Sequence, residues 1–150
     1  MNFNSIKIYP NELNKVLEEY NESIIIAVSP SCNLDRREGS FRIALIYHKY
    51  KKIYYRELKD IASSNKCAIY GLIEGASHIT QPKNVVIMTA TTFGFKRALS
   101  RRSDNQDIWD ELFEVLEKKG CPNLTEVVVF GGGDELAKLT DKTSKNSDVV

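Results

Sequence analysis

The chain has 150 residues, of which 42% are hydrophobic and 27% are charged, and 21 Lys and Arg against 20 Asp and Glu leave a formal net charge of +1. A single domain of this length buries enough surface to form a full hydrophobic core without a disulfide or a structural metal ion. The balanced charge excludes a protein that holds nucleic acid by its overall charge, so any such binding must depend on a local basic patch.

The cysteines and the apolar runs indicate a protein of the cytoplasm. Cys32, Cys67 and Cys121 are odd in number and form no pair at the spacing of zinc ligands, which is typical of reduced thiols. No stretch approaches the roughly 18 consecutive apolar residues that a membrane span requires, and the first residues lack the apolar segment of a secretory signal. We therefore expect a cytoplasmic protein that does not bind membranes.

Apolar periodicity predicts strands and helices in an irregular order. β-branched and alternating apolar runs predict a short strand at 6–9 and five further strands at 24–28, 41–47, 53–58, 85–88 and 125–130. Helical spacing with local start and stop signals predicts helices at 13–20, 63–80, 91–100 and 105–120, and a last helix from 134 onward. The Ser-Pro-Ser sequence at 29–31 is expected to form a turn after the second strand.

The chain is expected to contain one domain with an extension at each end. Residues 1–22 are interpreted as an N-terminal appendage of one strand and one helix, residues 23–142 as the domain, and residues 143–150 as a flexible tail. The first three strands of the domain follow one another without a helix between them, which favours an antiparallel meander.

The order of elements predicts an α/β (α+β) fold, because three strands, a helix, a strand, two helices, a strand and a helix exclude a regular βαβ repeat. Five short strings stand at informative places: Val28-Ser29-Pro30-Ser31-Cys32, Ser63-Ser64-Asn65-Lys66-Cys67-Ala68, Thr89-Ala90-Thr91, Asn105-Gln106-Asp107-Ile108-Trp109 and Asp134-Glu135-Leu136-Ala137. In order and spacing they resemble the ribonuclease H-like family. The resemblance implies a five-stranded mixed sheet flanked by helices, with an extra N-terminal strand and helix.

The resemblance also implies a catalytic site that this sequence lacks. In the family, four carboxylates hold two magnesium ions about 4 Å apart, and the RNA strand of an RNA/DNA hybrid is hydrolysed. Magnesium takes oxygen ligands, so carboxylates at these positions are a chemical requirement. Ser29, Ala68 and Ala90 stand at three of the positions, and Asp134 alone keeps a carboxylate. We therefore expect a pseudoenzyme without metal or cofactor, with magnesium only if the site proves active.

Binding of nucleic acid does not require the metals. The resemblance implies phosphate or backbone contacts from Ser63, Asn65 and Asn105, although Ser63 and Asn105 are equally suited to cap helices. A basic stretch lies in roughly the region where some members of the family carry a basic handle for the hybrid, and a solvated helix end explains it about as well. The stretch contains Lys96, Arg97, Arg101 and Arg102.

Three functions remain open at this stage. The first is a catalytically inactive ribonuclease H-like domain that binds an RNA/DNA hybrid or a duplex through phosphate contacts. The second is a protein interaction module, like the non-catalytic connection segment of reverse transcriptases, with a protein partner or a second copy of the chain. The third is an active, metal-dependent ribonuclease H with a rearranged site, in which Asp134 retains its role.

Overall fold

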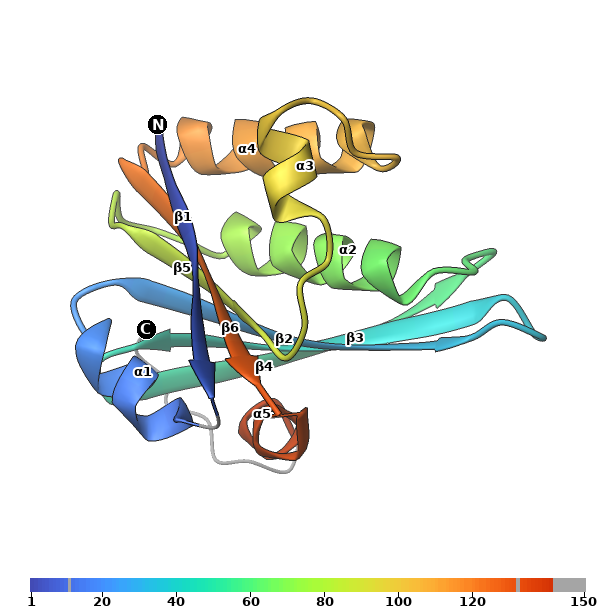
Figure 1. Ribbon diagram of the computed structural model, residues 1–150, viewed down its shortest axis with the longest axis horizontal. Helices are drawn as coiled ribbons and strands as arrows, with labels where there is room; N and C mark the ends of the chain where they lie inside the picture. Colours follow the sequence, from blue (N-terminus) through green and yellow to red (C-terminus); the bar gives the residue numbers. More distant parts are fainter. Residues whose placement is uncertain (11, 132, 142–150) are drawn as a thin grey trace.

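The apolar runs of the chain form one mixed sheet of six strands with helices on both faces (Figure 1). The computed structural model describes residues 1–10, 12–131 and 133–141, and it describes residues 5–10 by their backbone alone. The expectation of a mixed sheet flanked by helices is confirmed. The expected tail at 143–150 and the last residue of the expected domain lie outside the described residues.

The strands pair as the connections between them predict. The six strands are β1 (Asn2–Pro10), β2 (Ile24–Asn33), β3 (Glu38–Tyr47), β4 (Tyr50–Lys59), β5 (Val85–Thr89) and β6 (Asn123–Phe130). Their order across the sheet is β1-β6-β5-β2-β3-β4. β2, β3 and β4 form the expected antiparallel meander. β5 pairs in parallel with β2 and with β6. Parallel pairing needs a crossover connection, and helices precede both β5 and β6 in the chain.

The N-terminal segment belongs to the same sheet. β1 pairs in parallel with β6, with one shift of register between Asn4 and Lys7. α1 (Leu13–Glu19) follows and buries Val16 against one face of the sheet. Residues 1–22, which the sequence suggested as an appendage, thus supply the sixth strand and part of the cover of the sheet.

Helices cover both faces because the central strands are buried on both sides. The remaining helices are α2 (Ser64–Ser77), α3 (Phe95–Leu99), α4 (Gln106–Lys118) and α5 (Gly133–Leu139). α2, α3 and α4 cover the face that buries Ile26 and Ile87, as Figure 1 shows. α1 and α5 lie on the opposite face, where Ile25 and Val86 are buried.

β2 continues through the segment that was expected to be a turn, so that expectation is wrong. Ser29, Pro30 and Ser31 pair with β3, and Pro30 lies opposite Phe41. The proline is tolerated because β5 pairs with β2 only as far as Ala27, so no strand on that side needs the missing N–H of proline. β2, β3 and the end of β4 therefore project from the body of the molecule as an arm (Figure 1).

The helix expected at 91–100 is shorter than predicted. Gly94 has a φ angle of +98°, a left-handed conformation that ends regular helical geometry, and α3 begins only after it. Residues 91–94 therefore form a non-helical link between β5 and α3. This link passes one wall of the pocket described below.

Candidate functional site

Three of the four positions that the family resemblance assigns to metal binding line one pocket. Ser29 on β2, Ala68 on α2 and Ala90 directly after β5 border a hollow of about 250 Å³. These residues are far apart in sequence, and the pairing of β5 with β2 together with the packing of α2 on the sheet brings them together. Asp134 does not line this pocket, although its neighbour Gly133 does, and it is exposed in the first turn of α5.

The pocket does not fit the pair of magnesium ions that the family resemblance implies. The thirteen described residues that line it carry no ionisable side chain, and their side-chain polar groups are serine and threonine hydroxyls and one asparagine amide. Within the described part of the chain, no three His, Cys, Asp or Glu side chains form a group able to hold a metal ion. Since magnesium relies on carboxylate oxygens to be held in a protein site, this donor set is unsuitable.

The hydroxyl of Ser29 is engaged inside the protein. Ser29 Oγ lies 2.9 Å from Thr140 Oγ1, and the fully buried Thr140 lies just after α5. Thr140 Oγ1 is also 2.9 Å from the carbonyl oxygen of Leu136. This contact joins the end of α5 to β2 at the pocket.

The first turn of α2 forms another wall of the pocket. Ser63 caps the helix, because the backbone N–H of Lys66 donates a hydrogen bond of 3.2 Å to Ser63 Oγ. Ser64 and Asn65 follow the cap and line the pocket. The first turn contains no acidic residue, so the positive end of the helix dipole is not neutralised from within the helix.

Thr89 adds a polar group whose role the string Thr89-Ala90-Thr91 did not reveal. It is the last residue of β5, it lines the pocket, and only 4% of its surface is exposed. Its hydroxyl oxygen is buried and has no hydrogen-bond partner in the part of the chain that the structure describes. A threonine at the end of an apolar run is typical of many strands, so the pattern contains no signal that would single it out.

Asn105 lies outside the pocket lining, at the start of α4. Its side chain makes no capping hydrogen bond, so the capping role considered for it from the sequence is not realised. The first turns of α2 and α4 lie at the same end of the helical layer (Figure 1). Ser63, Asn65 and Asn105 therefore belong to one end of the molecule, although Asn65 alone of the three borders the pocket.

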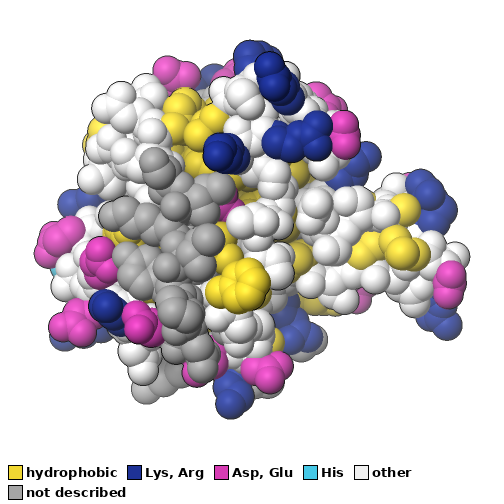
Figure 2. Space-filling model, viewed as in Figure 1, with side chains coloured by type: hydrophobic (Ala, Val, Ile, Leu, Met, Phe, Trp, Pro, Cys, Tyr) yellow, Lys and Arg dark blue, Asp and Glu magenta, His cyan; other side chains and the backbone are white. Residues whose placement is uncertain are grey.

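In the basic stretch, two side chains bind other groups of the protein and two are exposed without an ion pair among the described residues. Arg101 forms a two-pronged ion pair with Asp110, with N–O distances of 3.1 and 2.8 Å, and this pairing lowers the pKa of Asp110. Arg97 donates a hydrogen bond of 3.0 Å to the carbonyl oxygen of Arg102. The side chains of Lys96 and Arg102 are exposed, with no ion pair among the described residues. Figure 2 shows Lys and Arg side chains gathered on this part of the surface, over α3.

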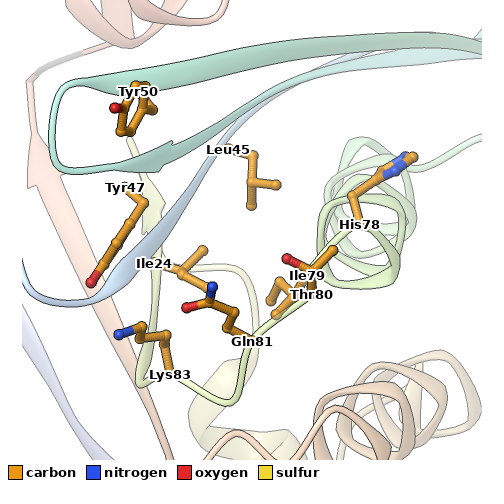
Figure 3. A pocket seen from close by; sticks show the side chains of 9 residues that line it. All are labelled: Ile24, Leu45, Tyr47, Tyr50, His78, Ile79, Thr80, Gln81 and Lys83. Carbon is orange, nitrogen blue, oxygen red and sulfur yellow. The ribbon is translucent and has the colours of Figure 1, made fainter. Parts of the chain in front are cut away.

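A second pocket, of about 170 Å³, lies at the opposite end of β2 (Figure 3). Its walls include Tyr47 and Tyr50 from the turn between β3 and β4, and the segment that follows α2. Lys83 Nζ lies 5.2 Å from the centre of the Tyr47 ring, and His78 stacks on Tyr54 at 4.0 Å. No described residue of this pocket has a buried side-chain polar atom without a partner, in contrast to Thr89.

Glu126 is a buried carboxylate outside both pockets. It lies on β6 beside Ile87 of β5, and its surface is fully buried. Both carboxylate oxygens lack a hydrogen-bond partner in the described structure. Burial raises the pKa of Glu126 from 4.5 to about 7, so the side chain is largely protonated in mildly acidic solution.

The chain matches no protein-family model and no curated protein. Among the helices of the described residues, none has the length and apolar character needed to cross a membrane.

Proposed function

We propose that the protein is a ribonuclease H-like domain that has lost catalysis and binds nucleic acid through phosphate groups. The arrangement of β2 to β6 supports this proposal, because these five strands belong to a mixed sheet flanked by helices, as the sequence resemblance implies. β1 and α1 add to this arrangement without interrupting it.

One observation carries the proposal. Ser29, Ala68 and Ala90, which the resemblance places at three metal-binding positions, border the same pocket, and the described residues that line it include no carboxylate. Convergence of three distant positions supports the fold assignment, and the lack of anionic oxygens among these described residues argues against metal-dependent cleavage.

The surroundings of the pocket favour phosphate binding. The uncapped N–H groups at the start of a helix and neutral hydroxyl and amide groups are common donors to phosphate oxygens, and Ser64 and Asn65 supply such groups at the pocket. Lys96 and Arg102 are exposed cations in and shortly after α3, the helix that follows the link containing the pocket residues Thr91 and Phe93. The net charge of +1 makes such a local patch necessary, because bulk attraction to a polyanion is weak.

The binding test compares two double variants by fluorescence anisotropy with a labelled RNA/DNA hybrid in EDTA. Lys96→Glu with Arg102→Glu is expected to weaken binding about tenfold and to reduce the slope of log affinity against log salt concentration by about 2. Lys15→Glu with Lys49→Glu makes the same change of charge at exposed sites on α1 and in the turn between β3 and β4, and it serves as the control. Equal affinity of both variants with the parent protein contradicts the proposed surface.

Catalysis is tested on the same hybrid with magnesium or manganese. The proposal expects no cleavage beyond that of a protein-free sample. Metal-dependent cleavage that Asp134→Asn abolishes contradicts the proposal and establishes the rearranged nuclease instead.

A role in protein association is the second candidate, because several large apolar side chains are exposed, two of them by more than half of their surface. Leu34 at the tip of the arm is 65% exposed and Phe130 at the end of β6 is 62% exposed. Light scattering tests this candidate with a second copy of the chain as the partner. A dimer that Leu34→Ser dissociates supports it, and a monomer at high concentration excludes self-association.

A further inference from the structure

We propose that the pocket bordered by Ser29, Ala68 and Ala90 binds a phosphate group directly, without a metal ion. This inference deepens the proposed function and rests on it for one point, that the phosphate normally belongs to a nucleic-acid backbone. The fold resemblance implies a phosphate held through two metals, whereas this pocket offers donors that contact an anion without them.

The start of α2 supplies the first donors. Ser63 Oγ accepts the N–H of Lys66, and the carbonyl oxygen of Ser63 accepts the N–H of Cys67. Ser64 and Asn65 precede Lys66 and Cys67 in the helix. Their backbone N–H groups have no hydrogen-bond acceptor among the described residues. Both residues line the pocket, and α2 has 14 residues, so its dipole is that of a full helix.

Thr89 supplies independent support from the sheet. Its hydroxyl is buried in a residue that lines the same pocket, and the hydroxyl has no hydrogen-bond partner among the described residues. A buried hydroxyl without a partner is unfavourable, and a phosphate oxygen in the pocket would accept its proton. Ser29 is not needed as a donor, because its hydroxyl already contacts Thr140.

The charges around the pocket permit an anion within it. Ala68 and Ala90 leave space where larger acidic side chains would both fill the pocket and repel phosphate. Asp134 and Glu135 lie in the first turn of α5, next to the lining residue Gly133, and both are exposed and outside the lining. Their repulsion of a bound anion is therefore weakened by solvent. Asp134→Asn is therefore expected to strengthen phosphate binding about twofold, whereas a metal-dependent site would lose affinity.

The experiment follows backbone amide signals by NMR while inorganic phosphate is added in EDTA at constant ionic strength. Saturable shifts are expected for Ser64, Asn65 and Thr89, with no such shifts when chloride replaces phosphate. Thr89→Val removes the buried hydroxyl with little change of shape and is expected to weaken phosphate binding about tenfold. Thr125→Val is its matched control, because Thr125 is buried on the neighbouring strand β6 and its hydroxyl accepts a hydrogen bond from Asn4.

Ser64→Pro provides a second test that does not alter the sheet. Proline is favoured at the first position of a helix, and Ser63 has φ −147° and ψ 120°, the extended conformation that a residue before proline requires. This variant removes one N–H from the pocket while the helix is retained, and it is expected to weaken phosphate binding about tenfold. Ser64→Ala keeps the N–H, removes the hydroxyl and is the control.

The outcomes separate this inference from the proposed function. Phosphate binding that is weakened by Thr89→Val and Ser64→Pro and retained in both controls supports the inference, whether or not the protein binds the hybrid. Absence of shifts at the pocket, or equal binding by all four variants, overturns it even if the basic segment binds the hybrid. Parallel titrations with a dinucleotide and with a nucleoside monophosphate distinguish a backbone phosphodiester from a free phosphate monoester as the source.

Discussion

Thr140 Oγ1 lies 2.9 Å from Ser29 Oγ, although 111 positions separate the two residues in sequence. A threonine hydroxyl carries one proton, so a Thr140 that donates to the carbonyl oxygen of Leu136 accepts the proton of Ser29. The side chain at position 29 therefore connects β2 with the end of α5. The resemblance assigns position 29 to metal binding, but in this protein the side chain of Ser29 forms a hydrogen bond that joins two elements of the fold.

Loss of this contact is expected to destabilise the protein. Thr140→Val keeps the shape of a fully buried side chain but leaves Ser29 and the Leu136 carbonyl without that partner, at a cost of about 1–2 kcal/mol in the free energy of unfolding. Urea denaturation measures this change. A double-mutant cycle with Ser29→Ala should show coupling of about 0.5–1 kcal/mol, and additive effects would show that the two hydroxyls do not interact.

Protonation of Glu126 is expected to make stability depend on pH. The pKa of this carboxyl is raised from 4.5 to about 7 in the folded protein, so the folded state binds the proton more tightly than the unfolded state. The stabilising effect of protonation is complete below pH 4.5 and is lost as the pH rises towards 7, by about 3 kcal/mol. Urea denaturation between pH 4.5 and 8 measures this loss. Glu126→Gln should remove that part of the pH dependence, and an unchanged profile would contradict the assignment.

Two arginines of the basic stretch are expected to contribute unequally to nucleic-acid binding. Arg101 is paired with Asp110 through both of its terminal nitrogens, whereas Arg102 has no ion pair among the residues that the structure describes. Arg102→Gln should weaken binding of a labelled hybrid more than Arg101→Gln does, because Arg102 does not have to leave a carboxylate. Fluorescence anisotropy at two salt concentrations compares the two variants. A larger effect of Arg101→Gln would mean that the Arg101 side chain leaves Asp110 and contacts the ligand.

Gly39 on β3 is expected to tolerate no larger side chain. A Cβ atom at this position would overlap Cys67 Sγ on α2 and lie 2.8 Å from Ile61 Cγ2. Gly39→Ala should lower the free energy of unfolding by about 1–3 kcal/mol, as measured by urea denaturation. Gly133→Ala is the control, because a Cβ atom there meets no atom within 4 Å. Combination with Cys67→Ala should restore part of the loss at Gly39, and no restoration would place the strain elsewhere.

The main elements could be predicted because their signals are local. The continuous apolar run from Ile24 to Val28 and the helical spacing of Ile108, Trp109 and Leu112 correspond to β2 and α4. Capping by Ser63 was one of the two roles that the sequence left open, and it depends on a local partner, because Lys66 is only three residues away. Pro30 and Gly94 were misjudged, because the effect of each depends on whether a neighbouring strand or helix needs its backbone.

The candidate site was predictable only in part. Its alanines at 68 and 90 were found through the resemblance, and the structure places both at the pocket with Ser29. Two threonines could not be singled out from the sequence. The hydroxyl of Thr89 matters because it is buried without a hydrogen-bond partner among the described residues, and Thr140 matters because it contacts Ser29 across 111 positions. No local pattern contains either property.

The amino-acid sequence by itself determined most of the strands and helices of this protein. Side-chain spacing within a short segment decides whether a helix or a strand can bury the apolar side chains of that segment. The folded arrangement alone decided that β1 joins the sheet, that Glu126 is enclosed, and that Ser64 and Thr89 border the same pocket. Burial and hydrogen bonding at these positions depend on segments that meet only after folding.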